Sequence, residues 1–274
     1  GIVKMTRFIL RGTFSIELFG AILLAIYFCP KYGLGKGIWF SIFHSISAFC
    51  NAGFDLMGTA EPFSSLTAQV GNWYVNLIIM SLIVVGGLGF FVWRDILNTR
   101  LHFTKMQLHT KLVLTVTAFL IISGSVLLFL FEHGTASFEG LTLSEQIAAS
   151  SFQSVSARTA GFNTIDLAAL TESGRFLIII LMFIGASPGS TAGGIKTTTF
   201  AVLALSVVTT FRSRKSTEVF GRRLEEMITR KATCIFMLYL SLSLSVSMII
   251  ARIENIEFLD ALFESVSAIA TVGL

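Results

Sequence analysis

Long apolar stretches separated by short polar connectors set the pattern of this chain of 274 residues. A helix needs about 20 apolar residues to cross the hydrocarbon core of a bilayer, which is about 30 Å thick. Five stretches are long enough, and they are 8–28, 73–93, 112–131, 175–211 and 232–251. Three shorter semi-apolar runs lie between them, at 37–49, 143–157 and 256–269. Because these runs are too short to span and too apolar for ordinary loops, we expect half-helices that enter the membrane and return.

The charges divide the connectors into two groups. Residues 94–111 carry four Lys/Arg against one acid, and residues 212–231 carry seven against three. The connectors that hold the short runs together carry five basic and eleven acidic residues. The positive-inside rule therefore places the basic connectors in the cytoplasm and the short runs outside. The basic connectors are either orientation signals alone or also a docking surface for a cytosolic partner, and binding of nucleic acid is not expected.

Composition supports the membrane and argues against catalysis. Hydrophobic residues make up 54% of the chain and charged residues only 13%, whereas soluble domains carry roughly 25% charged residues. The three Cys and four His show no paired or clustered spacing, so neither a disulfide framework nor a metal site is expected. A nucleophile–base set is equally lacking in the sequence pattern. We therefore expect no enzyme and no cofactor, only a transported ion.

An internal repeat is the most specific signal in the sequence. The pattern Phe-x-Ser-[Ile/Val]-Ser-Ala begins at Phe43, Phe152 and Phe263, at spacings of 109 and 111 residues. In each copy three or four further residues separate the Ala from a Gly, which a large apolar residue follows; the middle copy is the shorter one. Repetition of one unit at a near-constant period indicates a structure built from equivalent modules.

The chemistry of the repeat points to cations. A half-helix that ends inside the membrane carries unpaired carbonyls and a partial negative charge. The extended segment that follows can line a wet cavity, and rings of its carbonyls can replace the hydration shell of an ion. We expect the Ser pair of each copy to bond this returning segment; the alternative is a small-residue packing face with Gly as a helix cap. The expected ion-binding carbonyls are those of Asn51, Ala52, Gly53, Thr159, Ala160, Gly161, Thr271, Val272 and Gly273.

The stretch 175–211 is too long for one straight span. Its 37 residues would reach about 55 Å as a continuous helix. Residues 185–197 combine helix-breaking and polar residues, so we expect an unwound loop that lines the cavity below the filter; a kinked packing helix is the alternative. Small residues would let this loop block ions and move aside. The expected gate residues are Gly185, Ser187, Pro188, Gly189, Ser190, Thr191, Gly193, Gly194 and Lys196.

Several single charges lie near these segments. Arg158 precedes the second filter segment and is expected to bond nearby carbonyls or acids more readily than the ion. Lys196 either repels cations in a closed state or extends toward the cytoplasm. Asp55, Asp166 and Asp260 are expected near the outer mouth, where acidity raises the local cation concentration.

The filter segments and the loop 185–197 resemble the Trk/Ktr/HKT superfamily of potassium transporters. The filter loops of this superfamily resemble Asn51-Ala-Gly-Phe, Thr159-Ala-Gly-Phe-Asn and Thr271-Val-Gly-Leu. Its signature loop resembles Gly185-Ala-Ser-Pro-Gly-Ser-Thr-Ala-Gly-Gly-Ile-Lys-Thr. The likeness covers nearly the whole chain and is closest to the membrane (B) subunit of bacterial Ktr-type potassium uptake systems. It implies an all-α, multi-pass protein of the bacterial plasma membrane, with a pseudo-fourfold pore, preference for potassium and a gating loop. It also implies a homodimer regulated by a cytosolic nucleotide-binding ring, with sodium as a candidate co-ion.

These observations give an order of segments along the chain. We expect a helix–pore loop–helix repeat at 1–93, a basic connector at 94–111 and a second repeat with the gating loop at 112–211. A second basic connector follows at 212–231, and a helix and pore loop of a further repeat at 232–274. Since a fourfold ring needs four loops, we expect another repeat before Gly1 and a closing helix after Leu274; the alternative is a pore closed by another copy of the chain. The competing interpretation is a secondary transporter of another small solute, built from parallel repeats.

Overall fold

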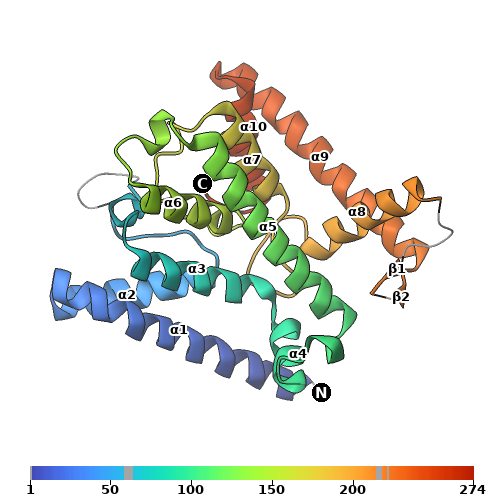
Figure 1. The fold of residues 1–274 in the computed structure, drawn as a ribbon, viewed down its shortest axis with the longest axis horizontal. Helices are drawn as coiled ribbons and strands as arrows, with labels where there is room; N and C mark the ends of the chain where they lie inside the picture. Colours follow the sequence, from blue (N-terminus) through green and yellow to red (C-terminus); the bar gives the residue numbers. More distant parts are fainter. Residues whose placement is uncertain (1, 59–63, 214–217, 221) are drawn as a thin grey trace.

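The computed structural model describes residues 2–58, 64–213, 218–220 and 222–274. The described residues form ten α-helices, three short 3-10 helices and one two-stranded hairpin. Figure 1 shows the helices arranged in neighbouring groups, with α1 and α2 side by side at one end and α9 and α10 at the other. The predicted all-helical architecture is confirmed for the apolar part of the chain.

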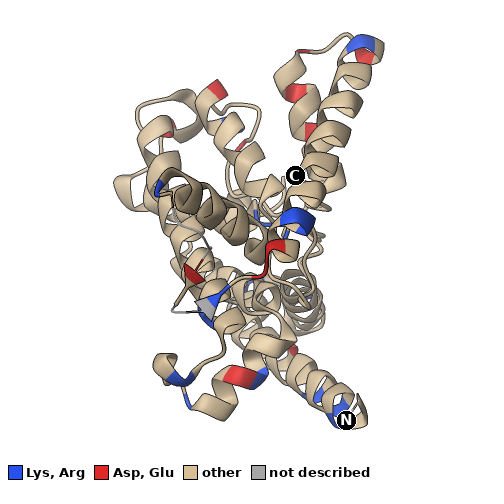
Figure 2. Ribbon diagram, turned by 90° about the vertical axis from the view of Figure 1, so that its right-hand side faces the viewer, with Lys and Arg blue, Asp and Glu red and all other residues tan. Residues whose placement is uncertain are grey.

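Three helices are long and apolar enough to cross a membrane: α1 (Ile2–Tyr32), α5 (Leu108–Glu132) and α9 (Glu226–Glu254). They contain the predicted spans 8–28, 112–131 and 232–251 and extend beyond them at both ends. Large apolar side chains on their outer faces remain exposed, among them Phe14 on α1, Phe119 on α5 and Leu238 on α9. Figure 2 shows most charged residues at helix ends and in connecting segments. Helices with apolar middle parts and charged ends are typical of proteins that span a lipid bilayer.

The predicted span 73–93 is bent. It consists of α3 (Trp73–Leu88) and α4 (Phe90–Thr99), which meet at an angle of 94°. Gly89 takes φ 91° and ψ 149° at the junction, a conformation that a residue with a Cβ rarely adopts. The indole N–H of Trp93 donates to the Val85 carbonyl across the bend at 2.9 Å. The connector predicted at 94–111 therefore starts within α4 and continues through η2 (Phe103–Lys105).

Three short helices correspond to the predicted half-helices. They are α2 (Leu34–Phe49), α6 (Leu143–Ser156) and α10 (Phe258–Ile269). Their lengths are about 24, 21 and 18 Å at 1.5 Å per residue, which is less than the thickness of the hydrocarbon core. Each packs against the long helix before it, α2 on α1, α6 on α5 and α10 on α9.

Each long helix with its short helix and the helix that follows is called a unit here, so α1–α3 belong to the first unit, α5–α7 to the second and α9–α10 to the third. Contacts between these units bring the short helices near one another. Helix α3 of the first unit packs on α6 of the second, and α7 (Glu172–Phe183) packs on α10 of the third. One hydrophobic cluster joins the first unit to α6 through Phe49, Ile79 and Phe152. A second cluster joins α5 and α7 to α10 through Met182 and Val266.

The long stretch 175–211 is interrupted as predicted. Helix α7 ends at Phe183, α8 (Thr197–Phe211) begins fourteen positions later, and the segment between them is not helical. A single parallel bridge between Ile184 and Ile195 brings the two ends of this segment together. The chain thus leaves the helix, folds back on itself and resumes a helix from nearly the same place.

A buried carboxylate at the end of α5 fixes the outer loops of the second unit. Glu132 is fully buried and accepts hydrogen bonds from the hydroxyls of Thr171 at 2.6 Å, Ser137 at 2.7 Å and Thr135 at 3.1 Å. Thr171 is also the N-cap of α7, because its hydroxyl accepts from the Gly174 amide. A buried carboxylate needs such donors to offset its lost hydration, so Glu132 ties the end of α5 to the start of α7.

A short hairpin, which the sequence did not predict, lies in the connector 212–231. Strands β1 (Glu218–Val219) and β2 (Arg222–Arg223) pair antiparallel, and α9 begins shortly after them at Glu226. Residues 214–217 and 221 of the predicted connector lie outside the described residues.

Candidate functional site

The second Ser of each repeat bonds the segment that follows its short helix. Ser47, Ser156 and Ser267 donate through Oγ to the carbonyls of the residues that follow the predicted filter glycines. These acceptors are Phe54 at 2.7 Å, Phe162 at 2.5 Å and Leu274 at 3.0 Å. The same bond in three copies indicates that each loop is held in the same way.

The first Ser of each repeat does not bond the returning segment, so this part of the prediction is wrong. Ser45 donates to the Glu17 carbonyl of α1 at 2.6 Å, and Ser154 to the Ile121 carbonyl of α5 at 2.9 Å. Ser265 donates within its own helix to Ala261 at 2.7 Å. In the first two units this Ser therefore fixes the short helix to the preceding long helix.

The three loops share one backbone conformation. The amide of the middle filter residue donates back to the carbonyl of the second Ser, at 2.9 Å for Ala52, 2.9 Å for Ala160 and 2.8 Å for Val272. The residues on either side of it have positive φ in every copy. Their values are 50° and 72° at Asn51 and Gly53, 71° and 83° at Thr159 and Gly161, and 56° and 85° at Thr271 and Gly273.

The loops come from distant parts of the sequence and meet. A Cβ added at Gly53 would lie 2.6 Å from the Ala160 carbonyl oxygen and 2.9 Å from the Gly161 Cα. A Cβ added at Gly161 would collide with the Val272 carbonyl oxygen. Residues expected to form one filter are thus neighbours, although their role as ion ligands stays a prediction. Close backbone approach requires Gly at two of these positions.

The segment 184–196 lies against the inner ends of these loops. The hydroxyl of Thr191 donates to the Phe49 carbonyl at 3.0 Å, and the Asn51 amide group donates to Thr191 Oγ1 at 3.5 Å. A Cβ at Gly193 would collide with the Thr271 hydroxyl and would lie 2.7 Å from the Ala270 carbonyl oxygen. One segment therefore contacts the first and third loops together.

The same segment is held by the bent span. The amides of Ser187 and Thr191 donate to the Gly87 and Gly86 carbonyls at 3.0 and 3.4 Å, and the Phe90 amide donates to the Gly189 carbonyl at 2.9 Å. The 94° bend at Gly89 thus places the end of α3 and the start of α4 beside the loop.

Other predicted gate residues make contacts within the segment 184–196 itself. Ser190 donates to the Ser187 carbonyl at 2.6 Å. A Cβ at Gly185 would lie 2.9 Å from the Gly194 Cα. The Lys196 ammonium donates to the Ala192 carbonyl at 2.7 Å, so its hydrogen bonds go to the loop itself and not to the cytoplasmic side.

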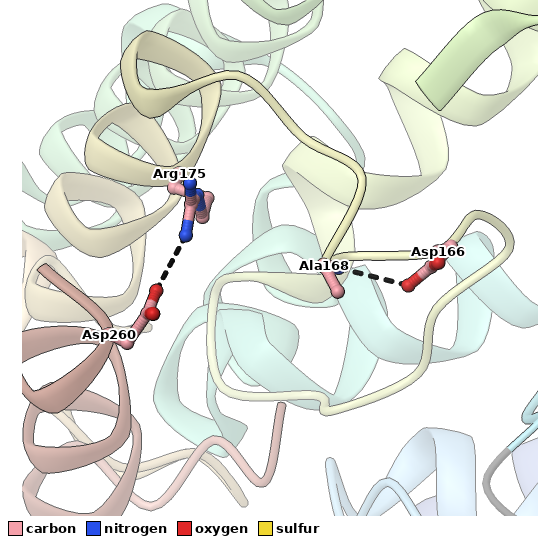
Figure 3. Close-up of polar contacts among 4 residues, drawn as sticks. All are labelled: Asp166, Ala168, Arg175 and Asp260. Atoms are coloured by element: carbon pink, nitrogen blue, oxygen red, sulfur yellow. Dashed lines mark hydrogen bonds and ion pairs between the residues drawn. The ribbon is translucent and has the colours of Figure 1, made fainter. Parts of the chain in front are cut away.

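The single charges near the predicted filter segments have local partners. Figure 3 shows the Arg175–Asp260 ion pair at 2.6 Å and the Asp166 carboxylate accepting from the Ala168 amide at 2.9 Å. Asp55 likewise accepts from the Met57 amide at 2.8 Å. Arg158 is buried and contacts two uncharged oxygens, the Thr117 hydroxyl and the Gly185 carbonyl.

The site as a whole offers backbone oxygens and helix ends. Helices α2, α6 and α10 end directly before the three loops, so their partial negative charges are directed toward one region. Among the described residues no group of three His, Cys, Asp or Glu could hold a metal ion. This chemistry suits an ion that is bound through carbonyls and released again.

Apolar spanning helices, short helices that return and an interrupted span define a multi-pass α-helical membrane protein built from repeated units. The chain belongs to the TrkH family of cation transport proteins, whose sequence profile matches residues 1–274.

Individual relatives agree with this assignment. The chain is 41% identical over 280 residues to the potassium/sodium uptake protein NtpJ of Enterococcus hirae, and 38% identical over 281 residues to the Ktr system potassium uptake protein B of Bacillus subtilis. Both matches cover 100% of this chain and 60% of the relative. The crystal structure of the potassium transporter TrkH from Vibrio parahaemolyticus matches with a TM-score of 0.74 at 18% identity, over 95% of this chain and 53% of that one. This last likeness shows the fold.

Ser267→Ala should destabilise the third loop, because it removes the acceptor of the Gly273 and Leu274 amides as well as the donor to the Leu274 carbonyl. Leaving such groups unpaired costs about 1–3 kcal/mol. Thermal denaturation of the full-length protein in detergent measures the loss. Ser265→Ala is the matched control, since its hydroxyl bonds only its own helix. Equal losses in the two variants would contradict a special role for the second Ser.

Proposed function

We propose that this protein takes up potassium through a pore lined by the carbonyls of residues 51–53, 159–161 and 271–273. The convergence of the three loops carries the proposal. Their repeated conformation presents backbone oxygens from equivalent positions, and several such oxygens can replace the hydration shell of an ion. The names of the relatives, potassium/sodium uptake protein and potassium uptake protein, support the choice of ion. Sodium is a candidate co-ion.

The filter glycines account for selectivity in this proposal. Gly53 and Gly161 combine positive φ with neighbouring carbonyls or Cα atoms closer than a Cβ permits. Any larger residue would shift at least one carbonyl of the ring, and selectivity depends on the number and geometry of these carbonyls.

The segment 185–197 is the proposed gate. Its Thr191 hydroxyl occupies the Phe49 carbonyl at the C-terminal end of α2, and Gly193 lies against Ala270 and Thr271 after α10. The segment therefore fills the region beneath the loops and uses oxygens that would otherwise attract a cation. Flux requires this segment to move aside.

Partners are proposed from charge and from the relatives. The basic connectors 94–111 and 212–231 offer a cytoplasmic surface for a nucleotide-binding regulatory ring, and the membrane protein is proposed to act as a homodimer in the plasma membrane. Relatives are named as proteins of a Ktr system. The second connector follows α8 directly, so a displacement of the connector would reach the gate along one helix.

Gly161→Ser should lower the preference for potassium over sodium by about tenfold, because a side chain at positive φ costs about 1–2 kcal/mol and displaces the Val272 carbonyl. Potassium-dependent growth and sodium permeability in a transport-deficient strain measure the effect. Gly35→Ser is the control, since a Cβ at Gly35 meets nothing within 4 Å. Unchanged selectivity in both Gly53→Ser and Gly161→Ser would reject the filter assignment.

Deletion of residues 189–194 from the proposed gate should raise rubidium flux several-fold by removing the obstruction. Thr191→Val should raise it less, because only the hydroxyl bonded to Phe49 is lost. Ser190→Ala is the matched control, since its hydroxyl donates within the loop. Wild-type flux in folded, inserted deletion protein would show that this segment is not the gate.

Reversal of Arg222 and Arg223 to Glu should weaken binding of the regulatory ring and reduce nucleotide control of flux. The variant should still insert and dimerise, and its topology is checked first because charge sets orientation. Lys36→Glu, at the start of α2 and outside both basic connectors, should leave binding unchanged. Co-purification of the ring at wild-type stoichiometry, with normal nucleotide-dependent flux, would reduce the connector to an orientation signal.

A further inference from the structure

Arg158 is a buried cation placed between the filter and the gate. Its side chain is 5% exposed, and no carboxylate of the described residues lies within ion-pair distance of it. Its Nη2 lies 3.5 Å from the Thr117 hydroxyl of α5 and 3.5 Å from the Gly185 carbonyl oxygen. Its Nε has no partner among the described residues. Since a buried charge without compensation is strongly destabilising, something other than an acid must stabilise the guanidinium.

A hydroxyl and a backbone carbonyl contact the guanidinium, and three helices end near Arg158. Arg158 follows the C-terminal end of α6, and Gly185 lies two positions after the end of α7. A cavity of about 10 Å³ beside the guanidinium is lined by Thr117, Ala186 and Gly87, the last of which belongs to the final turn of α3. The last turns of helices carry unpaired carbonyls and partial negative charge. The cavity is too small for a carboxylate and can hold one water at most, so the stabilisation comes from uncharged oxygens, which include the Thr117 hydroxyl and the Gly185 carbonyl.

The charge occurs in only one of the three repeats. Two residues after the second Ser, the first copy has Phe49 and the third has Ile269, whereas the second has Arg158. Apolar residues at this position are sufficient for a short helix to end and its loop to return. The second unit differs because the gate segment starts beside it, at Gly185 and Ala186.

We infer that Arg158 is a positioning residue that couples the second filter loop to the gate. Its guanidinium joins α5 to the first residues of the gate segment, and its backbone leads directly into Thr159 of the filter. Movement of Gly185 removes one of its acceptors and changes the support of the Thr159 carbonyl. The effect on flux rests on the proposed function, whereas the structural link does not.

Hydrogen–deuterium exchange of the full-length protein in detergent tests the link without transport. Arg158→Gln should speed exchange in peptides covering residues 184–197 by about tenfold, because the start of this segment loses the contact between the Gly185 carbonyl and the guanidinium and opens more often. Arg175→Gln is the matched control, since Arg175 pairs with Asp260 away from this segment, and it should leave exchange there unchanged. Unchanged exchange in Arg158→Gln would overturn the inference.

Rubidium flux in two backgrounds tests the coupling. Arg158→Gln should change flux several-fold with the gate segment intact and have little effect after deletion of residues 189–194. Equal effects in both backgrounds would show that Arg158 acts on the filter alone and would overturn the coupling. Faster exchange with unchanged flux would keep the structural link and reject the gate of the proposed function.

If Arg158→Gln does not fold, Thr117→Val tests the link instead, because it keeps the charge and removes only the contact with α5. Unchanged exchange in this variant would then overturn the inference.

Discussion

Backbone polar groups that lie outside helices at membrane depth must find partners within the protein, because lipid offers none. This constraint governs the centre of the molecule. Each return from a short helix is closed by a Ser hydroxyl, such as Ser47 on the Phe54 carbonyl. The interrupted span meets the same demand through the Gly86 and Gly87 carbonyls and the Lys196 ammonium. Irregular backbone is therefore concentrated in one region where each segment supplies hydrogen bonds to another.

A consequence of this arrangement is that the proposed filter and gate are one hydrogen-bonded assembly. Thr191 bonds the Phe49 carbonyl and lies next to Asn51, while Gly193 lies against the third loop. The bent span holds the opposite side of the segment through Phe90. The segment cannot move without changing the ends of two short helices, so under the proposed function the opening of the gate is linked to the conformation of the proposed filter.

The sequence predicted well whatever depends on hydrophobicity and repetition. The short helices begin and end within three residues of the predicted runs, and the interruption after Phe183 lies where Gly and Pro accumulate. Local patterns could not predict the 94° bend, because the apolar run continues through Gly89 and the bend depends on a contact with Gly189 about a hundred positions away. The partners of Ser45 and Lys196 were missed for a related reason. A polar side chain shows that a partner is needed, and tertiary packing decides which one it is.

The close approach of Gly86 to the Phe49 carbonyl and of Gly193 to the Ala270 carbonyl also bears on how such a sequence can diverge. In both contacts a backbone faces a backbone, so no choice of neighbouring side chain can make room for a methyl group. Lipid-facing positions such as Phe14 can exchange one apolar residue for another during evolution. At Gly86 and Gly193, in contrast, an accepted replacement requires a second unit of the chain to shift at the same time. Sequence variation among homologues should therefore accumulate on the outer surface, while the residues at contacts between units change little.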